Sequence, residues 1–184
     1  MRMQRAITLM IIFLFAAMPT YGSADYVDAL TKEASDLMRK YALADNQEQK
    51  QALEEIAALA KKNKSNENVI RIYTQILASS GHYKKAISVL EPFTRERPES
   101  ALLLQECMLK ERVRQHDAQC YKNALSAAEK KGVNNLDYLM ILYFSGDKRF
   151  DQAKEKYLCH NGSDAIISIF DKSRDEVLKQ LYPK

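Results

Sequence analysis

The sequence predicts an all-helical protein. Apolar residues recur at helical spacing almost everywhere after Asp25, which is the pattern of helices that bury one face. No segment alternates between apolar and polar residues for long enough to indicate a strand. Five glycines, four prolines and no tryptophan among 184 residues fit a helical chain with few tight turns.

Two helices are expected at the start of this region. The apolar face of the first is marked by Val27, Leu30, Ala34, Leu37, Met38 and Tyr41, and that of the second by Ala52, Leu53, Ile56, Ala57 and Ala60. The polar stretch Asp45–Glu48 separates them as a turn. The stretch Lys61 to Asn68 is too polar for a core and is expected to be a connection.

The stretch from Glu67 to Ser100 carries a motif with a defined spacing. It contains Tyr73, then Gly81-His82-Tyr83, then Ala86, Leu90, Phe93 and Pro98. This stretch resembles a tetratricopeptide repeat, whose two helices pack antiparallel around a small residue at their contact. Thr74 and Phe93 depart from the pattern, because the family places glycine and alanine there.

Steps of about 34 residues, the length of this repeat, test the resemblance along the chain. They place Ala52, Ala86 and Cys120 at equivalent positions, and Phe150, Ala153 and Tyr157 continue the pattern after a shift of about one residue. The resemblance implies an antiparallel helix-hairpin solenoid with repeats at about 33–66, 67–100, 101–134 and 135–161. An irregular helical bundle is the alternative.

The end of the chain is expected to form a capping helix over residues 163–182. Ser163 would cap it, and Ile166, Ile169, Phe170, Val177, Leu178 and Leu181 would face the last repeat. Its other face, with Lys172, Arg174, Asp175 and Lys179, would face water, as the end of a solenoid requires. Together with the repeats it makes residues 25–184 one helical domain.

The first residues indicate export. Arg2 and Arg5 precede an apolar run from Ala6 to Met18, about thirteen residues, which suits a signal peptide and is too short to span a bilayer. The small residues Gly22 and Ala24 predict cleavage after Ala24, so that residues 1–24 are removed. An uncleaved anchor is the alternative. A lipoprotein is not expected, because the first cysteine is Cys107.

The charge of the mature chain argues against a nucleic-acid partner. Without Arg2 and Arg5 the basic count falls from 28 to 26, against 24 acidic residues. Nucleic-acid binding needs a clustered basic face, which so balanced a composition does not indicate. No second apolar run approaches membrane length, so the mature chain is not expected to span a membrane.

Three cysteines in an exported chain invite a disulfide. The repeat resemblance places Cys107 and Cys120 opposite each other across a helix contact, with the turn near Val113 and Arg114. We therefore expect a Cys107–Cys120 bridge; two buried free thiols are the alternative. Cys159 is left unpaired, and it is either buried in the last hairpin or available to a partner.

Signs of chemistry are few. His116, Cys120 and Cys107 could share a face as metal ligands, but a fourth donor and the usual close ligand pairs are missing. Cys159-His160 would be a poor catalytic pair, because adjacent helix residues point in different directions. No other catalytic motif occurs. The sequence therefore predicts a non-enzymatic protein without a cofactor or metal.

The resemblance also implies a binding groove, since such arrays bind partners on the concave face of their first helices. The candidate groove residues are Arg71, Gln75, Gln105, Leu109, Arg112, Tyr138 and Leu142. Their mixed character suits a peptide segment or a helix of another protein. We expect a periplasmic adaptor or scaffold that assists an envelope assembly, such as a pilus, a secretion system or the outer-membrane machinery. The alternative is a periplasmic inhibitor or immunity protein that blocks a toxic enzyme.

Overall fold

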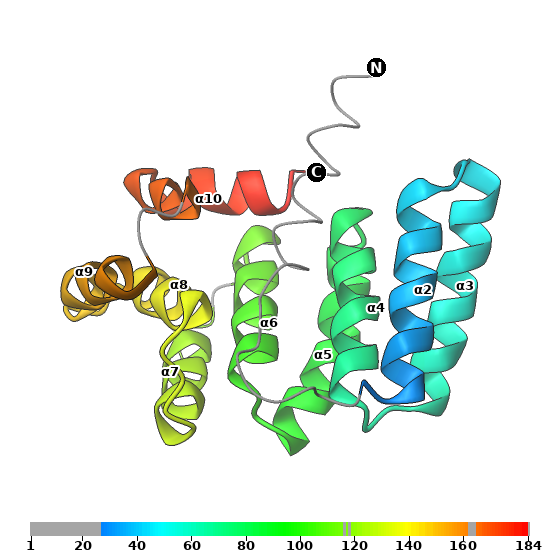
Figure 1. The fold of residues 1–184 in the computed structure, drawn as a ribbon, viewed down its shortest axis with the longest axis horizontal. Helices are drawn as coiled ribbons and strands as arrows, with labels where there is room; N and C mark the ends of the chain where they lie inside the picture. Colours follow the sequence, from blue (N-terminus) through cyan, green and yellow to red (C-terminus); the bar gives the residue numbers. More distant parts are fainter. Residues whose placement is uncertain (1–26, 116, 118, 162–164, 184) are drawn as a thin grey trace. The chain divides into compact units, whose positions relative to one another are not determined.

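A computed structural model describes residues 27–115, 117, 119–161 and 165–183 (Figure 1). Every regular element in these ranges is a helix, which confirms the predicted all-helical class. No helix in the described ranges is both long enough and apolar enough to cross a membrane. The predicted signal peptide, residues 1–24, lies outside the described residues.

The chain divides into two compact units between His82 and Tyr83. The boundary falls inside the motif-rich stretch from Glu67 to Ser100, at its Gly81-His82-Tyr83 turn. We therefore describe each unit by itself.

The described part of the first unit contains three helices with polar N-caps. They are α2 (Ala29–Leu43), α3 (Asn46–Lys62) and α4 (Glu67–Ser79), and they all pack against one another (Figure 1). Asp28, Asp45 and Asn66 precede them, and each side chain accepts hydrogen bonds from backbone N–H groups of the first turn. Such caps satisfy donors that have no partner within the helix.

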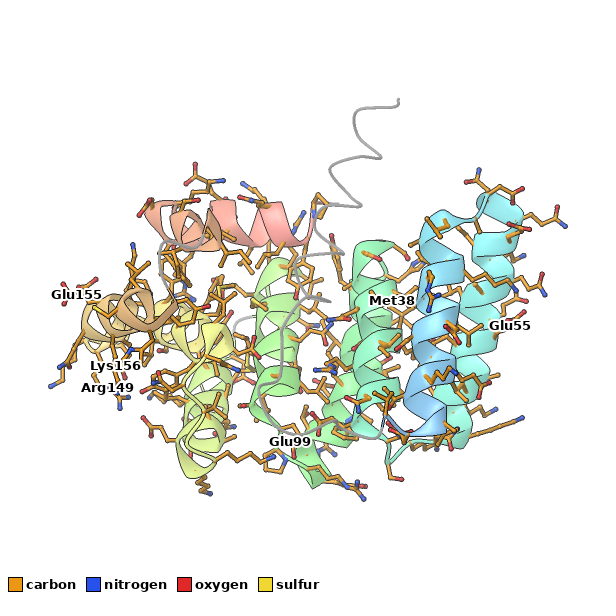
Figure 2. The ribbon with its side chains drawn as sticks, viewed as in Figure 1. Met38, Glu55, Glu99, Arg149, Glu155 and Lys156 are labelled. Atoms are coloured by element: carbon orange, nitrogen blue, oxygen red, sulfur yellow. A yellow bond between two sulfur atoms is a disulfide. The ribbon has the colours of Figure 1, made fainter. Side chains whose placement is uncertain are left out.

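Helices α2 and α4 run parallel, as contacts at their two ends show. At the N-terminal ends, the Asn66 amide donates to the Asp28 carboxylate over 3.2 Å. At the C-terminal ends, the hydroxyls of Tyr41 and Ser80 are 2.6 Å apart. On the outer side of this pair, Lys40 of α2 lies 3.2 Å from Glu55 of α3 (Figure 2).

Two details of the first unit correct the sequence analysis. The predicted turn at Asp45–Glu48 is shorter, because Asp45 caps α3 and the helix already begins at Asn46. Val27 was assigned to the buried face of the first helix, but it precedes α2 and is 59% exposed. Of the other predicted core positions, Ala34, Ala52 and Ile56 are fully buried and Ala60 is buried, whereas the rest are half-buried.

The second unit is organised around α6. It contains α5 (Tyr83–Glu96), α6 (Ser100–Arg112), α7 (Cys120–Lys130), α8 (Leu136–Ser145), α9 (Phe150–Asn161), η1 (Ala165–Asp171) and α10 (Arg174–Leu181). Helix α6 packs against α5, α7, α8 and α10, and every residue from Leu102 to Leu109 is buried. By contrast, Glu155 and Lys156 of α9 are exposed (Figure 2).

A disulfide joins α6 to the start of α7, as predicted. It links Cys107 and Cys120, whose Cα atoms are 5.6 Å apart, and both residues are buried. The turn also lies where it was expected, since α6 ends at Arg112 and Val113 and Arg114 follow. Cys159 is free, as predicted, and it is exposed.

The C-terminal segment differs from the predicted single helix over residues 163–182. It is a 3-10 helix, η1, followed by α10, because Ser173 begins a new helix: it forms a reciprocal capping box with Glu176. Helix α10 crosses the C-terminal end of α6 (Figure 1), where Arg112 Nε donates to the Tyr182 carbonyl over 2.8 Å. Ser163 lies outside the described residues.

Residues aligned at repeat spacing in α3, α5 and α7 are buried, whereas the fourth set, Phe150, Ala153 and Tyr157 of α9, is only half-buried. Ala52, Ala86 and Cys120 are at most 4% exposed. The next equivalent set, Ile56, Leu90 and Ala124, is fully buried. The pattern thus identified core positions of α3, α5 and α7 correctly.

Candidate functional site

A cleft of about 530 Å³ lies in the second unit. Its lining comes from four helices and the loop after α6: Cys107, Glu111, Gln115, Asp117, Tyr121, Lys122, Phe144, Ser145 and Arg174. The volume lies within the range of ordinary ligand sites, roughly 300–1,000 Å³. Apolar and charged groups both line it.

Glu111, in the last turn of α6, is the central acceptor of the cleft. Its carboxylate accepts a hydrogen bond from the Tyr121 hydroxyl over 2.7 Å. Arg174 Nη2 lies 3.0 and 2.9 Å from its two oxygens. The Glu111 side chain is only 19% exposed. A carboxylate so placed is stable only with such partners, because burial of an unpaired charge is costly.

Arg174 also covers an aromatic pair. The rings of Tyr121 and Phe144 are stacked, with centroids 5.6 Å apart and planes within 9°. The Arg174 guanidinium carbon lies 5.7 Å from the first ring centroid and 5.6 Å from the second. Arg174 is the first residue of α10. Cation–π attraction to the two rings and the ion pair with Glu111 therefore both hold its side chain against α7 and α8.

The environment of Tyr121 suppresses its ionisation. Burial raises the pKa of the Tyr121 hydroxyl well above its usual range, and the hydrogen bond to the Glu111 carboxylate raises it further. The hydroxyl is therefore a permanent donor to Glu111 at physiological pH. It is not suited to act as a general base.

A second charged cluster lies beside the cleft, centred on Lys110. Its ammonium is 2.6 Å from Glu106, 3.0 Å from Glu91 and 3.8 Å from Asp117. The buried Glu106 carboxylate also accepts from the Thr94 hydroxyl over 2.5 Å. Burial alone would lower the pKa of Lys110, but the hydrogen bonds to Glu106 and Glu91 outweigh it and raise the pKa.

Asp117 connects this cluster to the cleft. One of its carboxylate oxygens accepts from the backbone N–H groups of Gln119 and Cys120, at 3.0 and 3.1 Å, and so caps the start of α7. The other oxygen faces Lys110. Both acidic residues that line the cleft, Glu111 and Asp117, thus have cationic or N–H partners.

No protein-family model, no curated protein and no solved structure matches this chain.

The predicted groove residues fall into both units. Arg71 and Gln75 belong to α4 in the first unit, where Arg71 is exposed and donates to Asn68 over 2.9 Å. Tyr138 of α8 is half-buried in the second unit. These three residues have surface that a partner could reach.

Three of the predicted groove residues are core residues, which corrects the sequence analysis. Leu109 and Leu142 are fully buried, and Gln105 is only 7% exposed. The resemblance assumed that one face of each first helix stays open. Helix α6 instead packs against α5, α7, α8 and α10, and α8 buries half of its residues, Leu142 among them.

Arg112 is half-buried and serves the C-terminal segment. Besides its hydrogen bond to Tyr182, its guanidinium carbon lies 5.6 Å from the centroid of the Tyr83 ring. The rings of Tyr83 and Tyr182 meet edge to face at 5.9 Å. Arg112 is thus bound within the fold, where a partner-binding role had been predicted.

The metal-ligand alternative considered from the sequence loses two of its ligands, because Cys107 and Cys120 form the disulfide. His116 lies outside the described residues. Within the described ranges, no group of three or more His, Cys, Asp or Glu residues is arranged to hold a metal ion.

Sequence reasoning missed the residues that form the cleft. Glu111, Tyr121 and Lys122 were not singled out, and Arg174 was assigned only to the solvent-facing side of a cap. Their spacing gives no local signal, since Glu111 and Arg174 are separated by 63 residues. The one available signal was the disulfide pair, which marks the hairpin that carries Glu111 and Tyr121.

Proposed function

We propose that this chain is an exported, tetratricopeptide-like adaptor that acts in the periplasm by binding another protein. The observation that carries the proposal is the Cys107–Cys120 disulfide. Disulfides persist in oxidising compartments and are rare in the cytosol. The bridge therefore agrees with the signal-like N-terminal segment, which independently indicates export.

The adaptor role is supported by the kind of elements that the chain contains. Helices of about three turns follow one another through short connections, and residues at repeat spacing in α3, α5 and α7 are buried. Helical repeat arrays of this type commonly present extended surfaces to protein partners. The cleft in the second unit adds a concave surface with charged and aromatic groups.

In-cell crosslinking tests this function. An affinity tag is placed at the C-terminus of the full chain, intact cells are crosslinked, and the periplasmic fraction is purified under denaturing conditions. We expect one defined envelope protein to be enriched over a tagged, unrelated periplasmic protein. Repeated recovery of the chain alone would contradict an adaptor role.

Deletion of the gene then separates an adaptor from an immunity protein. Loss of an adaptor should cause an assembly defect at the envelope, without killing between sibling cells. Killing of the deletion strain by its wild-type siblings would instead identify an immunity protein.

A further inference from the structure

The acidic groups that line the cleft already have partners within the fold. Both Glu111 oxygens are occupied by Tyr121 and Arg174. One Asp117 oxygen caps α7 and the other faces Lys110. Arg174 balances the charge of Glu111, whereas Asp117 shares the Lys110 ammonium with the nearer carboxylates of Glu106 and Glu91.

Two cationic groups keep donors that the fold does not use. Arg174 bonds to Glu111 through Nη2, and its hydrogen bonds within the described residues leave Nε and Nη1 open. Lys122 is exposed, lines the same cleft and forms no ion pair within the described part of the chain. An Arg fork and a Lys ammonium are the usual donors to a carboxylate.

The remaining polar group suits a peptide backbone. Gln115 lines the cleft with an exposed side chain, whose amide can both donate and accept. The cleft is partly open to solvent, whereas small-molecule sites usually enclose most of their ligand. An open site suits a chain segment that continues past it on both sides.

We propose that this cleft binds an acidic segment of the partner protein, with a glutamate or aspartate carboxylate accepting hydrogen bonds from Lys122 and the free edge of Arg174. The inference rests on the proposed function and names the surface and the chemistry of the partner. It replaces the groove predicted from sequence, of which Leu109 and Leu142 are core residues.

Fluorescence anisotropy with defined peptides tests the proposal directly. The probes are a fluorescein-labelled peptide of about ten alternating glutamates and leucines, and its lysine-for-glutamate counterpart. The protein is purified from the periplasm with its disulfide intact. We expect the acidic peptide to bind and its affinity to fall as salt rises, because the contacts are exposed to solvent. Equal binding of the basic peptide would overturn the proposal.

Charge reversal locates the site. Lys122→Glu should weaken binding of the acidic peptide by at least about fivefold, which is the scale of an exposed ion pair replaced by a repulsion. The matched control is Lys130→Glu, since Lys130 is exposed on the same helix, is unpaired within the described residues and is not among the cleft residues. Equal weakening by both changes would place binding elsewhere and overturn the proposal.

Two further arms identify what is recognised. Arg174→Lys keeps the charge but loses the planar fork, so it should also weaken binding. The urea midpoint is measured for each variant, so that lost binding is read only on folded protein. Free glutamate and inorganic phosphate are tested as competitors of the labelled peptide. If either displaced the peptide as effectively, per anionic group, as unlabelled peptide does, the cleft would be a simple anion site. The proposal of a bound peptide segment would then be wrong.

The crosslinking experiment separates this inference from the proposed function. Capture of the wild-type partner at an undiminished level by the Lys122→Glu chain would leave the adaptor role standing and refute this surface. A partner captured by wild type and Lys130→Glu, but not by Lys122→Glu, supports both. No partner with any chain contradicts the proposed function itself.

Discussion

The hydroxyl of Tyr121 makes the shorter of the two side-chain contacts to Glu111, and its loss is a residue-scale test of the cleft. Tyr121→Phe keeps the stacked ring but removes the donor to a half-buried carboxylate. Hydrogen bonds to charged groups contribute about 1.5 kcal/mol or more to the free energy of unfolding, so we expect a loss of about that size in urea denaturation.

Tyr138→Phe is the matched control for this change. Tyr138 lies on α8, and its hydroxyl makes no hydrogen bond within the described residues. We expect its free energy of unfolding to stay within about 0.5 kcal/mol of wild type. Equal effects of the two substitutions would show that the Tyr121–Glu111 bond is not stabilising.

Asp147 should make stability depend on acid pH. Its carboxylate accepts from Nε and Nη2 of Arg149, at 2.8 and 2.7 Å, and from the Arg149 backbone N–H at 2.9 Å. The Arg149 side-chain bonds lower the pKa of Asp147 to about 2. A folded-state pKa below the unfolded value stabilises the fold above about pH 4, and this contribution is lost as the pH falls toward 2.

The measurement is the urea midpoint between about pH 5 and about pH 2.5. The wild-type midpoint should fall more steeply over this range than that of Asp147→Asn. Asp36→Asn serves as the control, because Asp36 forms only an exposed ion pair with Arg39, at 2.6 Å. Parallel slopes for wild type and Asp147→Asn would argue against the assignment.

At the scale of elements, the disulfide is expected to stabilise the α6–α7 hairpin. Its cysteines are 13 residues apart, and closing a loop of this length contributes about 3 kcal/mol on the chain-entropy model. The double variant Cys107→Ala/Cys120→Ala should lose about that much in urea denaturation, and a reductant should then have no further effect.

Cys159→Ala provides the comparison for the disulfide variant. Cys159 is exposed and unbridged, so its replacement should leave the unfolding free energy unchanged and keep the sensitivity to reductant. If instead the double alanine variant were as stable as wild type, the bridge would not hold the hairpin together.

The capping box is a second element-scale feature with a direct test. Ser173→Ala removes the hydroxyl that accepts from the Glu176 backbone N–H and contacts the Glu176 carboxylate. Loss of such a cap costs about 1 kcal/mol. Ser88→Ala on the exposed face of α5 should be neutral or slightly stabilising, because alanine is the better interior helix former. A neutral Ser173→Ala would show that α10 does not depend on its cap.

Comparison of elements shows what local patterns could predict. The repeat resemblance placed the start of a unit at Glu67, where α4 begins, and the turn at Val113 and Arg114. The polar stretch from Lys61 to Asn68 was predicted as a connection that is too long, because α3 continues to Lys62 and α4 already begins at Glu67. The break in the C-terminal segment was missed, although Ser173 and Glu176 have the spacing of a capping box. That signal was local and could have been used.

Most of the candidate site could not be predicted from local sequence patterns. Whether Gln105 and Leu109 face solvent depends on how many helices surround α6, which its own sequence does not specify. Helix α6 has low amphipathicity, and its polar residues Gln105 and Glu106 are both buried. Its sequence pattern therefore does not show whether the helix is exposed on one face or surrounded by other helices. The Glu111–Arg174 pair likewise depends on where α10 crosses α6.

At the scale of the whole molecule, export and the disulfide make one joint prediction. The exported chain should begin at Asp25 and carry one reactive thiol, Cys159, because Cys107 and Cys120 are bridged. Deletion of residues 6–18 removes the apolar run and should keep the chain in the cytoplasm. There the reducing environment should leave all three cysteines as thiols.

Alkylation with a maleimide-linked polymer under denaturing conditions counts these thiols as gel shifts. We expect one shift for the exported chain, three for the retained chain, and three for the exported chain after prior reduction. Mass spectrometry of the exported chain checks the new N-terminus. If the chains with and without residues 6–18 gave the same number of gel shifts, formation of the disulfide would not depend on export. An intact N-terminus on an exported chain would favour an uncleaved anchor, and the periplasmic adaptor would then act from the membrane surface.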